Sequence, residues 1–420
     1  MASPGWEQAR ERYAAEGVDA EAALKALSGV PVSLNCWQGD DVGGFEKAGA
    51  GPLDGGGLKA TGNYPGRARN PGELRADLDK ALSLVPGRHR VNLHAIYGEF
   101  GGKPVDRDAI GREHFEGWVE WARARKLYGL DFNATLFAHP KASSGYTLSD
   151  RDAGVRGFWV EHVKKCREIG AWMGGKFDNP CIHNLWIPDG SKDATSDRAG
   201  YRARLVESLD AIFVGTGHGA MLKDAVEPKL FGIGSESFVV GSHEFYLGYA
   251  VSRKLMPCFD MGHFHPTESV ADKLSAILPF TSEILVHASR GVRWDSDHVA
   301  IFDDSLRDLA AEAVRTGKLE RIHLALDYFD ASINRVAAWV VGMRAMLKSV
   351  LLALLEPHKR MLGLEAAGAL AGRLALAEAL KTMPFGAVWE EHCARASVPP
   401  DGAWMDTVRA YEKDVLSRRS

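Results

Sequence analysis

The chain alternates apolar, strand-like runs with helix-like stretches eight times, and this alternation limits its fold more than any other feature. The runs are PVSLNCW from Pro31, VNLHAI from Val91, GLDFNATLF from Gly129, IHNLWIP from Ile182, MLKDAVEP from Met221, MPCFDMG from Met256, EILVHAS from Glu283 and RIHLALDYF from Arg321. Runs that are apolar on both faces are typical of buried parallel strands. Eight strand-plus-helix units predict an α/β fold of the (β/α)8 TIM-barrel type rather than an open doubly wound sheet.

Helix signals follow each run. Asn70-Pro71 has the cap-then-proline order of a helix start, and Ser149-Asp150 is a second predicted start. The other helices are expected around 112–126 and 202–213 and near Glu244, Asp272, Leu306 and Val336. His265 and Glu268 are interpreted as part of another helix start, with Thr267 as a capping group.

Helical segments also flank the barrel sequence. Residues Trp6 to Leu27 form a helical prelude, and the strands stop after about Lys348. We therefore expect a catalytic barrel with its prelude over residues 1–348 and a C-terminal helical extension over 349–420. This extension either caps the barrel's own core or packs on a neighbouring subunit.

Composition narrows the choice of partners and of compartment. The net charge is −4 with spread Lys and Arg, which indicates neither nucleic acid nor an anionic membrane as partner. The five cysteines are widely spaced without a CxxC motif, so we expect no disulfide framework and a reducing cytoplasm. No apolar leader or run of about 20 apolar residues is evident. These features predict a soluble cytoplasmic protein that acts on a small molecule.

Carboxylates and imidazoles cluster at the ends of the fifth to eighth predicted strands. They are Glu227, Asp260, His263, His287, Asp295, Asp297 and Asp327. In a (β/α)8 barrel these strand ends meet at one mouth, where active sites are built. Five buried carboxylates would need compensation, and two divalent cations would leave about one net negative charge for neighbours such as Lys229 to offset. Oxygen and imidazole ligands suit Mn²⁺, Mg²⁺ or Co²⁺ and admit Zn²⁺.

Longer motifs add a family resemblance. NCWQGDDVGGFE, ATGNYPGRARN, LHAIY, NLWIPDG, KLFGIG, CFDMGHFHPTE, RWDSDHV and LDYFDASINR span nearly the whole chain. In order and spacing they resemble the bacterial L-rhamnose isomerase family and, more remotely, the xylose isomerase group. The resemblance implies a (β/α)8 barrel, a homotetramer, dependence on divalent metal with Mn²⁺ prominent, and reversible conversion of L-rhamnose to L-rhamnulose.

Roles for single residues follow from the same resemblance. It implies His263, Asp295 and Asp297 as ligands of a catalytic metal, and Glu227, Asp260, His287 and Asp327 as ligands of a structural metal. It also implies that Lys229 contacts the sugar oxygen at the reacting carbon and that His94 and Trp186 contact the sugar. Lys229, His94, Asp297 and Asp327 form the predicted catalytic set.

The chemistry of the reaction suggests two further expectations. Every obvious acid is assigned as a metal ligand, so a hydride shift between C2 and C1 is favoured over proton transfer through an enediol. Ile96, two residues after His94, is predicted to contact the methyl end of L-rhamnose, with simple packing as the alternative. The rival functions are a sugar 3-epimerase and a metal-stabilised carbohydrate-binding barrel.

Overall fold

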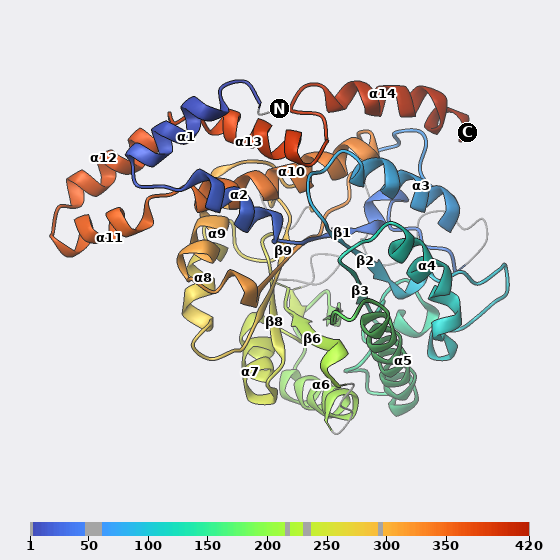
Figure 1. The fold of residues 1–420 in the computed structure, drawn as a ribbon. Coiled ribbons are helices and arrows are strands. Elements are labelled where there is room, and N and C mark those ends of the chain that lie inside the picture. The colour runs from blue at the N-terminus through green and yellow to red at the C-terminus, as the bar shows by residue number, and fades with distance from the viewer. Residues whose placement is uncertain (1–2, 47–60, 215–218, 230–236, 293–296, 420) are drawn as a thin grey trace.

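Eight parallel strands close into a barrel in the computed structural model of the chain (Figure 1). The structure describes residues 3–46, 61–214, 219–229, 237–292 and 297–419. The barrel strands are β1 (Val32–Asn35), β2 (Arg90–His94), β3 (Gly129–Asn133), β4 (Cys181–Trp186), β6 (Leu222–Glu227), β8 (Met256–Asp260), β9 (Ile284–Ala288) and β10 (Ile322–Leu326). β1 pairs with both β2 and β10, which closes the ring. All eight strand predictions and the (β/α)8 fold are confirmed.

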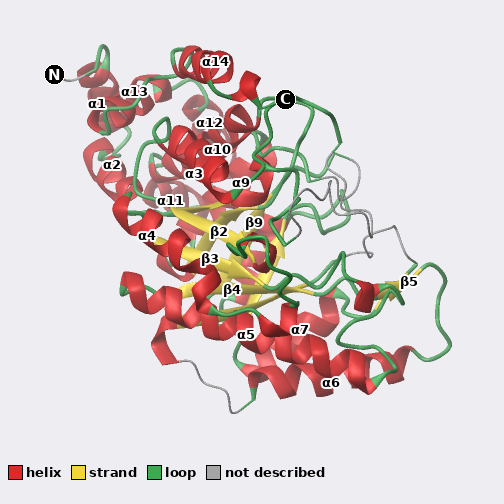
Figure 2. Ribbon diagram, turned by 90° about the vertical axis from the view of Figure 1, so that its right-hand side faces the viewer, coloured by secondary structure: helices red, strands yellow, loops and turns green. Residues whose placement is uncertain are grey.

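Helices surround the strands, and long loops gather on one side of the barrel (Figure 2). The helices that follow the strands are α3 (Pro71–Leu82), α4 (Glu116–Ala124), α5 (Ala153–Phe177), α6 (Arg198–Phe213), α7 (His243–Arg253), α8 (Val270–Ile277), α9 (Asp304–Arg315) and α10 (Arg335–Leu354). Asn70 caps α3 as predicted, because its side chain accepts a hydrogen bond from the Glu73 amide. A small antiparallel pair, β5 (Gly190–Ser191) and β7 (Phe238–Val239), was not predicted from the sequence.

Two predicted helix starts are wrong by a few residues. α5 begins at Ala153 with Asp152 as its cap, because the hydroxyl of Ser149 instead donates to Asp189 at 2.6 Å. α8 begins at Val270, and Thr267 bonds to the ring of His265 rather than capping the helix.

The prelude forms two helices, α1 (Trp6–Ala15) and α2 (Ala20–Ser28), separated at Gly17, which has a φ of 80°. The C-terminal part comprises α11 (His358–Ala366), α12 (Leu370–Leu380), α13 (Phe385–Arg395) and α14 (Trp404–Asp414). α13 packs on α1 and α10, whereas α11 and α12 project from the barrel (Figure 1).

One helix in the described part of the chain, α10, is long and apolar enough to cross a membrane. However, 83% of its most apolar window is buried inside the protein, where α10 packs against α9, α2 and α3. Helix α10 therefore serves as a core helix of the barrel.

Candidate metal and sugar site

Four predicted ligands converge at the carboxyl ends of neighbouring strands. Glu227 ends β6, Asp260 ends β8, His287 lies in β9 and Asp327 follows β10. One ligand atom from each lies within 4.8 Å of the others, a spacing that suits a single bound ion. The Nδ1 of His287 lies 3.0 Å from Asp327 and 3.3 Å from Glu227. The barrel topology produces this cluster, because β6, β8, β9 and β10 are consecutive around the ring.

Neighbouring groups hold these carboxylates in place. Asp260 accepts hydrogen bonds from the Gly262 amide at 2.6 Å and the Ser289 hydroxyl at 2.8 Å. The side-chain amide of Asn184 donates to Glu227, and the indole of Trp37 donates to Asp327 at 3.1 Å. These donors fix the orientation of the three carboxylates. The remaining ligand atoms of the same residues stay directed at the cluster.

Two buried polar atoms in the cluster have no hydrogen-bond partner among the described residues. They are the Oδ2 of Asp260 and the Nε2 of His287, and both side chains are fully buried. A buried polar atom without a partner is costly, so native proteins normally satisfy it with protein, water or an ion. The cluster therefore fits a cation that binds oxygen and imidazole ligands.

The protonation of the cluster reflects the same need for positive charge. Burial would raise the pKa of Glu227, but attraction to His287 lowers it to about 2. Burial disfavours a charged His287, yet Cys258, Glu227 and Asp327 raise its pKa well above the usual value. Burial and repulsion from Asp327 and Glu227 raise the pKa of Asp260 to about 7. Protons on His287 and Asp260 therefore offset the negative charge of the cluster, and a bound divalent cation would offset that charge in their place.

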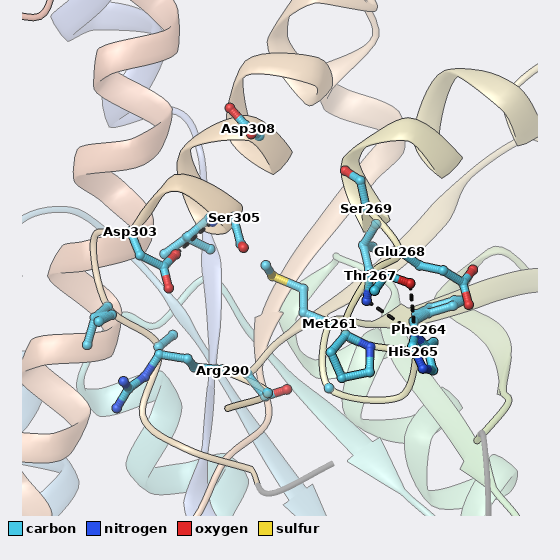
Figure 3. A pocket seen from close by; sticks show the side chains of 18 residues that line it. Met261, Phe264, His265, Thr267, Glu268, Ser269, Arg290, Asp303, Ser305 and Asp308 are labelled. Atoms are coloured by element: carbon cyan, nitrogen blue, oxygen red, sulfur yellow. Dashed lines mark hydrogen bonds between the residues drawn. The ribbon is translucent and has the colours of Figure 1, made fainter. Parts of the chain in front are cut away.

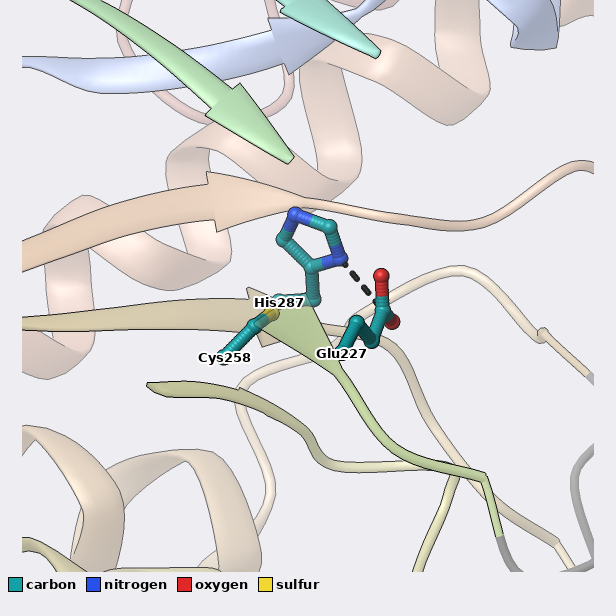
Figure 4. A group of neighbouring side chains, drawn as sticks. All are labelled: Glu227, Cys258 and His287. Atoms are coloured by element: carbon teal, nitrogen blue, oxygen red, sulfur yellow. Dashed lines mark hydrogen bonds and ion pairs between the residues drawn. The ribbon is translucent and has the colours of Figure 1, made fainter. Parts of the chain in front are cut away.

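Cys258 is a neighbour of the cluster that the sequence reasoning missed. Its thiol forms a possible group of three ligands with Glu227 and His287, which are also members of the four-residue cluster (Figure 4). The strand period could have indicated it, because Cys258 lies two residues before Asp260 on the same face of β8. All five cysteines are free, as predicted.

Several predicted residues line one cavity above the cluster. The lining comprises Trp37, Val42, His94, Asn133, Phe137, Trp186, Glu227, Lys229, His263, Asp297, Asp327 and Phe329. His263 lies 3.2 Å from Glu227, which joins the predicted second ligand set to the first. Asp295 lies outside the described residues. The sequence reasoning missed Val42, Asn133, Phe137 and Phe329; Asn133 could have been found from its place at the end of β3, directly opposite His94.

Lys229 and Trp186 form one wall of the cavity. The Lys229 ammonium lies 4.9 Å from the centre of the Trp186 ring, within the range of a cation–π contact. The His94 ring packs edge-on against Trp37 and against Phe137, and Phe137 in turn contacts Trp186. Burial lowers the pKa of His94 to about 3, so this imidazole is neutral near pH 7.

Ile96 lies apart from this lining. It is fully buried in the turn after β2 and packs beneath Gly44, so it does not face the cavity in the described structure. A second cavity lies between the loops that follow β8 and β9 (Figure 3). None of the described residues that line it belongs to the predicted ligand or sugar-contacting sets.

Known proteins match the chain almost from end to end. A family model described as L-rhamnose isomerase matches residues 2–419. The L-rhamnose isomerase of Rhodopirellula baltica is 55% identical over 415 residues, covering 99% of this chain and 96% of that protein. That of Salmonella typhimurium is 54% identical and covers 99% and 98% of the two chains. A solved D-tagatose 3-epimerase-like protein aligns at 14% identity with a TM-score of 0.45 and covers 62% of this chain and 89% of its own.

The full-length relatives share far more identity than chance or fold alone would give. Together with the family model, they show that this protein belongs to the L-rhamnose isomerase family and is an aldose–ketose isomerase.

Proposed function

We propose that the protein converts L-rhamnose to L-rhamnulose reversibly, with two divalent cations at the carboxyl end of the barrel. The observation that supports the metal dependence is the cluster of Glu227, Asp260, His287 and Asp327, in which two buried atoms have no hydrogen-bond partner among the described residues. His263, Asp295 and Asp297 form the proposed second ligand set. Mn²⁺ is the proposed ion, and Zn²⁺, Co²⁺ or Mg²⁺ also suits one site.

The bound cations would supply Lewis-acid polarisation of the sugar carbonyl. The protein's own side chains bind and orient the open-chain sugar. Trp186 and Trp37 offer apolar ring faces to carbon atoms, and the Lys229 ammonium donates hydrogen bonds to the sugar oxygen at the reacting carbon.

In this proposal the hydrogen on C2 moves to C1 as hydride, and the hydroxyl proton on O2 passes to O1. A proton route needs a free base beside these carbons. The carboxylates that line the cavity, Glu227, Asp297 and Asp327, are all proposed ligands. His94 remains as a contact to the sugar, since its depressed pKa makes it a poor base. L-Rhamnose labelled with deuterium at C2 should therefore give L-rhamnulose that keeps the label at C1 in ordinary water, whereas washout of the label would exclude the hydride route.

Metal dependence has a separate test. Asp260→Asn removes one charge from the cluster, so the purified variant should bind fewer equivalents of Mn²⁺ and lose isomerase activity. Asp308→Asn is the matched control, because Asp308 is exposed and lines the other cavity. Equal Mn²⁺ content and equal activity in the two variants would contradict the ligand assignment.

The assembly and location follow as proposals from the chain's surface and composition. We place the enzyme in the cytoplasm as a homotetramer, with the projecting α11–α12 pair as an intersubunit arm. Three exposed leucines support this, namely Leu362, Leu370 and Leu374. Helix α10 runs through residue 348, the predicted boundary between the catalytic barrel and the C-terminal extension. We therefore propose this boundary only as a division of function.

A further inference from the structure

Two consecutive residues in the loop after β1 have left-handed backbone conformations. The φ of Asp41 is 61° and that of Val42 is 59°. This region is rarely adopted by side chains other than glycine, and a β-branched residue is a genuine outlier there. Such conformations persist only where surrounding contacts enforce them. Val42 is 4% exposed and lines the proposed sugar cavity, so the unusual backbone lies at the site itself.

Arg335 makes the strongest contact to this turn. Its Nε and Nη2 donate to the two carboxylate oxygens of Asp41 at 2.7 and 2.8 Å, in a bidentate pair. Its remaining nitrogen donates to the Tyr64 carbonyl at 2.8 Å. The Arg335 side chain is 4% exposed and that of Asp41 is 11% exposed, so solvent screens the pair little.

The position of Arg335 in its own helix strengthens this interpretation. It is the first residue of α10, where the helix dipole disfavours a positive charge. Local helix energetics therefore do not explain an arginine here. The contacts with Asp41 and Tyr64 explain it.

Other contacts hold the two sides of the turn. Asp40 accepts hydrogen bonds from the Tyr97 hydroxyl at 2.6 Å and from the Gly44 amide at 2.7 Å. The Val42 amide donates to the Trp37 carbonyl at 3.0 Å. Gly44 has a φ of 66°, and a Cβ there would meet Ile96 at 2.7 Å. These contacts fix the residues on both sides of Asp41-Val42, and Arg335 restrains these two residues themselves.

We propose that Arg335 is a positioning residue that, through Asp41, holds Val42 in its left-handed conformation and so places the Val42 side chain as a wall of the sugar cavity. This inference rests on the proposed function, because the wall acts on a sugar bound in that cavity. A purely structural ion pair would instead stabilise the fold without altering the contact with substrate.

The test is a double-mutant cycle between the arginine and the valine. Arg335→Met removes the ion pair, and Val42→Gly removes the conformational cost, since glycine adopts positive φ freely. Arg335→Met alone should raise KM for L-rhamnose roughly tenfold with kcat within about threefold, while the Mn²⁺ concentration for half activation stays unchanged. In the Val42→Gly background, the same arginine change should shift KM by less than about threefold.

Three further variants separate positioning from stability. Arg344→Met is the matched control, because Arg344 is a buried arginine of α10 that pairs with Asp401 away from the cavity. It should lower Tm and leave KM unchanged. Arg335→Lys should partly rescue KM, and it replaces Arg335→Met if that variant does not fold. Val42→Ala shortens the side chain that lines the cavity but keeps a Cβ, and with it the conformational cost of a positive φ. Arg335→Met should therefore still lower the Tm of the Val42→Ala variant.

The outcomes separate the two proposals. Equal KM shifts in both valine backgrounds, or equal KM effects of the Arg335 and Arg344 changes, would overturn the positioning role. If the unmodified enzyme failed to isomerise L-rhamnose, the proposed function would fail instead. The cycle would then be measured by Tm, where additive effects of Arg335→Met and Val42→Gly would overturn the inference independently.

Discussion

Some residues near the strand ends reach the site, and others are turned away from it by the loops that follow the strands. Glu227, Asp260 and His287 were recognisable because each stands at or near the end of a predicted strand, and the barrel brings such ends together. Ile96 follows the same rule along the chain, yet it turns away from the cavity beneath Gly44. The difference arises from a short 3₁₀ turn at Ala95–Tyr97, which redirects the side chains after β2.

Ile96→Ala therefore tests whether position along a strand implies contact with the sugar. Ile96 is fully buried, so we expect the truncation to lower the free energy of unfolding by about 2–5 kcal/mol in urea titrations. The ratio of kcat/KM for L-rhamnose over L-mannose should stay within about threefold of the parental ratio. A tenfold or greater fall in that ratio would restore the predicted contact with the methyl end.

His89 allows a pH prediction for a buried imidazole outside the site. It accepts a hydrogen bond from the Val32 amide at Nδ1, and its Nε2 lies 2.9 Å from the Pro86 carbonyl. Burial lowers its pKa to about 4. The unfolded chain takes up this proton near pH 6.5 and the folded chain does not, so stability falls as the pH drops from about 6.5 to about 4.

The measurement compares the slope of unfolding free energy against pH in the parent and in His89→Gln. The variant should lose about 1.4 kcal/mol less per pH unit across that window, because one titrating group has been removed. Parallel slopes would mean that His89 is protonated in the folded state as well.

At the scale of elements, local signals placed strands better than helix starts. A strand is defined by a run of apolar residues, and all eight runs paired as expected. A helix start depends on which of several polar side chains caps it. Ser149 and Thr267 have side chains capable of capping, but Asp189 and His265 engage them instead.

Helix α3 provides a test of capping with an internal control. Asn70→Ala removes the side-chain oxygen that accepts from the Glu73 amide at 3.0 Å, so the free energy of unfolding should fall by about 0.5–2 kcal/mol. Ser269 precedes α8 without a side-chain capping bond, and Ser269→Ala should have a smaller effect. Urea denaturation of both variants measures the difference. An equal loss in the two would show that the Asn70 bond contributes nothing measurable.

The whole molecule combines a barrel with an apolar projection that its own chain leaves largely exposed. Helix α12 is rich in leucine and alanine, which are usually buried. In α12, however, Leu370 is 56% exposed and Leu374 is 58% exposed. Exposed apolar side chains grouped on a projecting element are typical of an interface.

We expect the double variant Leu370→Glu/Leu374→Glu to shift the enzyme from the proposed tetramer to smaller species in sedimentation velocity, because the new charges would be desolvated in the proposed interface. The control is Phe280→Glu, which alters a more exposed residue outside the arm. A parental protein that sediments as a monomer would contradict the tetramer, and an unaltered tetramer in the double variant would exclude this arm from its interface.

The sequence by itself determined the eight-stranded barrel and the four candidate ligands at consecutive strand ends. It could do so because apolar runs and turn signals are local, and because a closed parallel barrel brings the ends of its strands to one face. Only the tertiary structure decided that Val42 and Asn133 line the cavity, that Ile96 does not, and that Arg335 holds the turn at Asp41. These features join residues up to 294 positions apart, and such contacts arise from packing that no local pattern encodes.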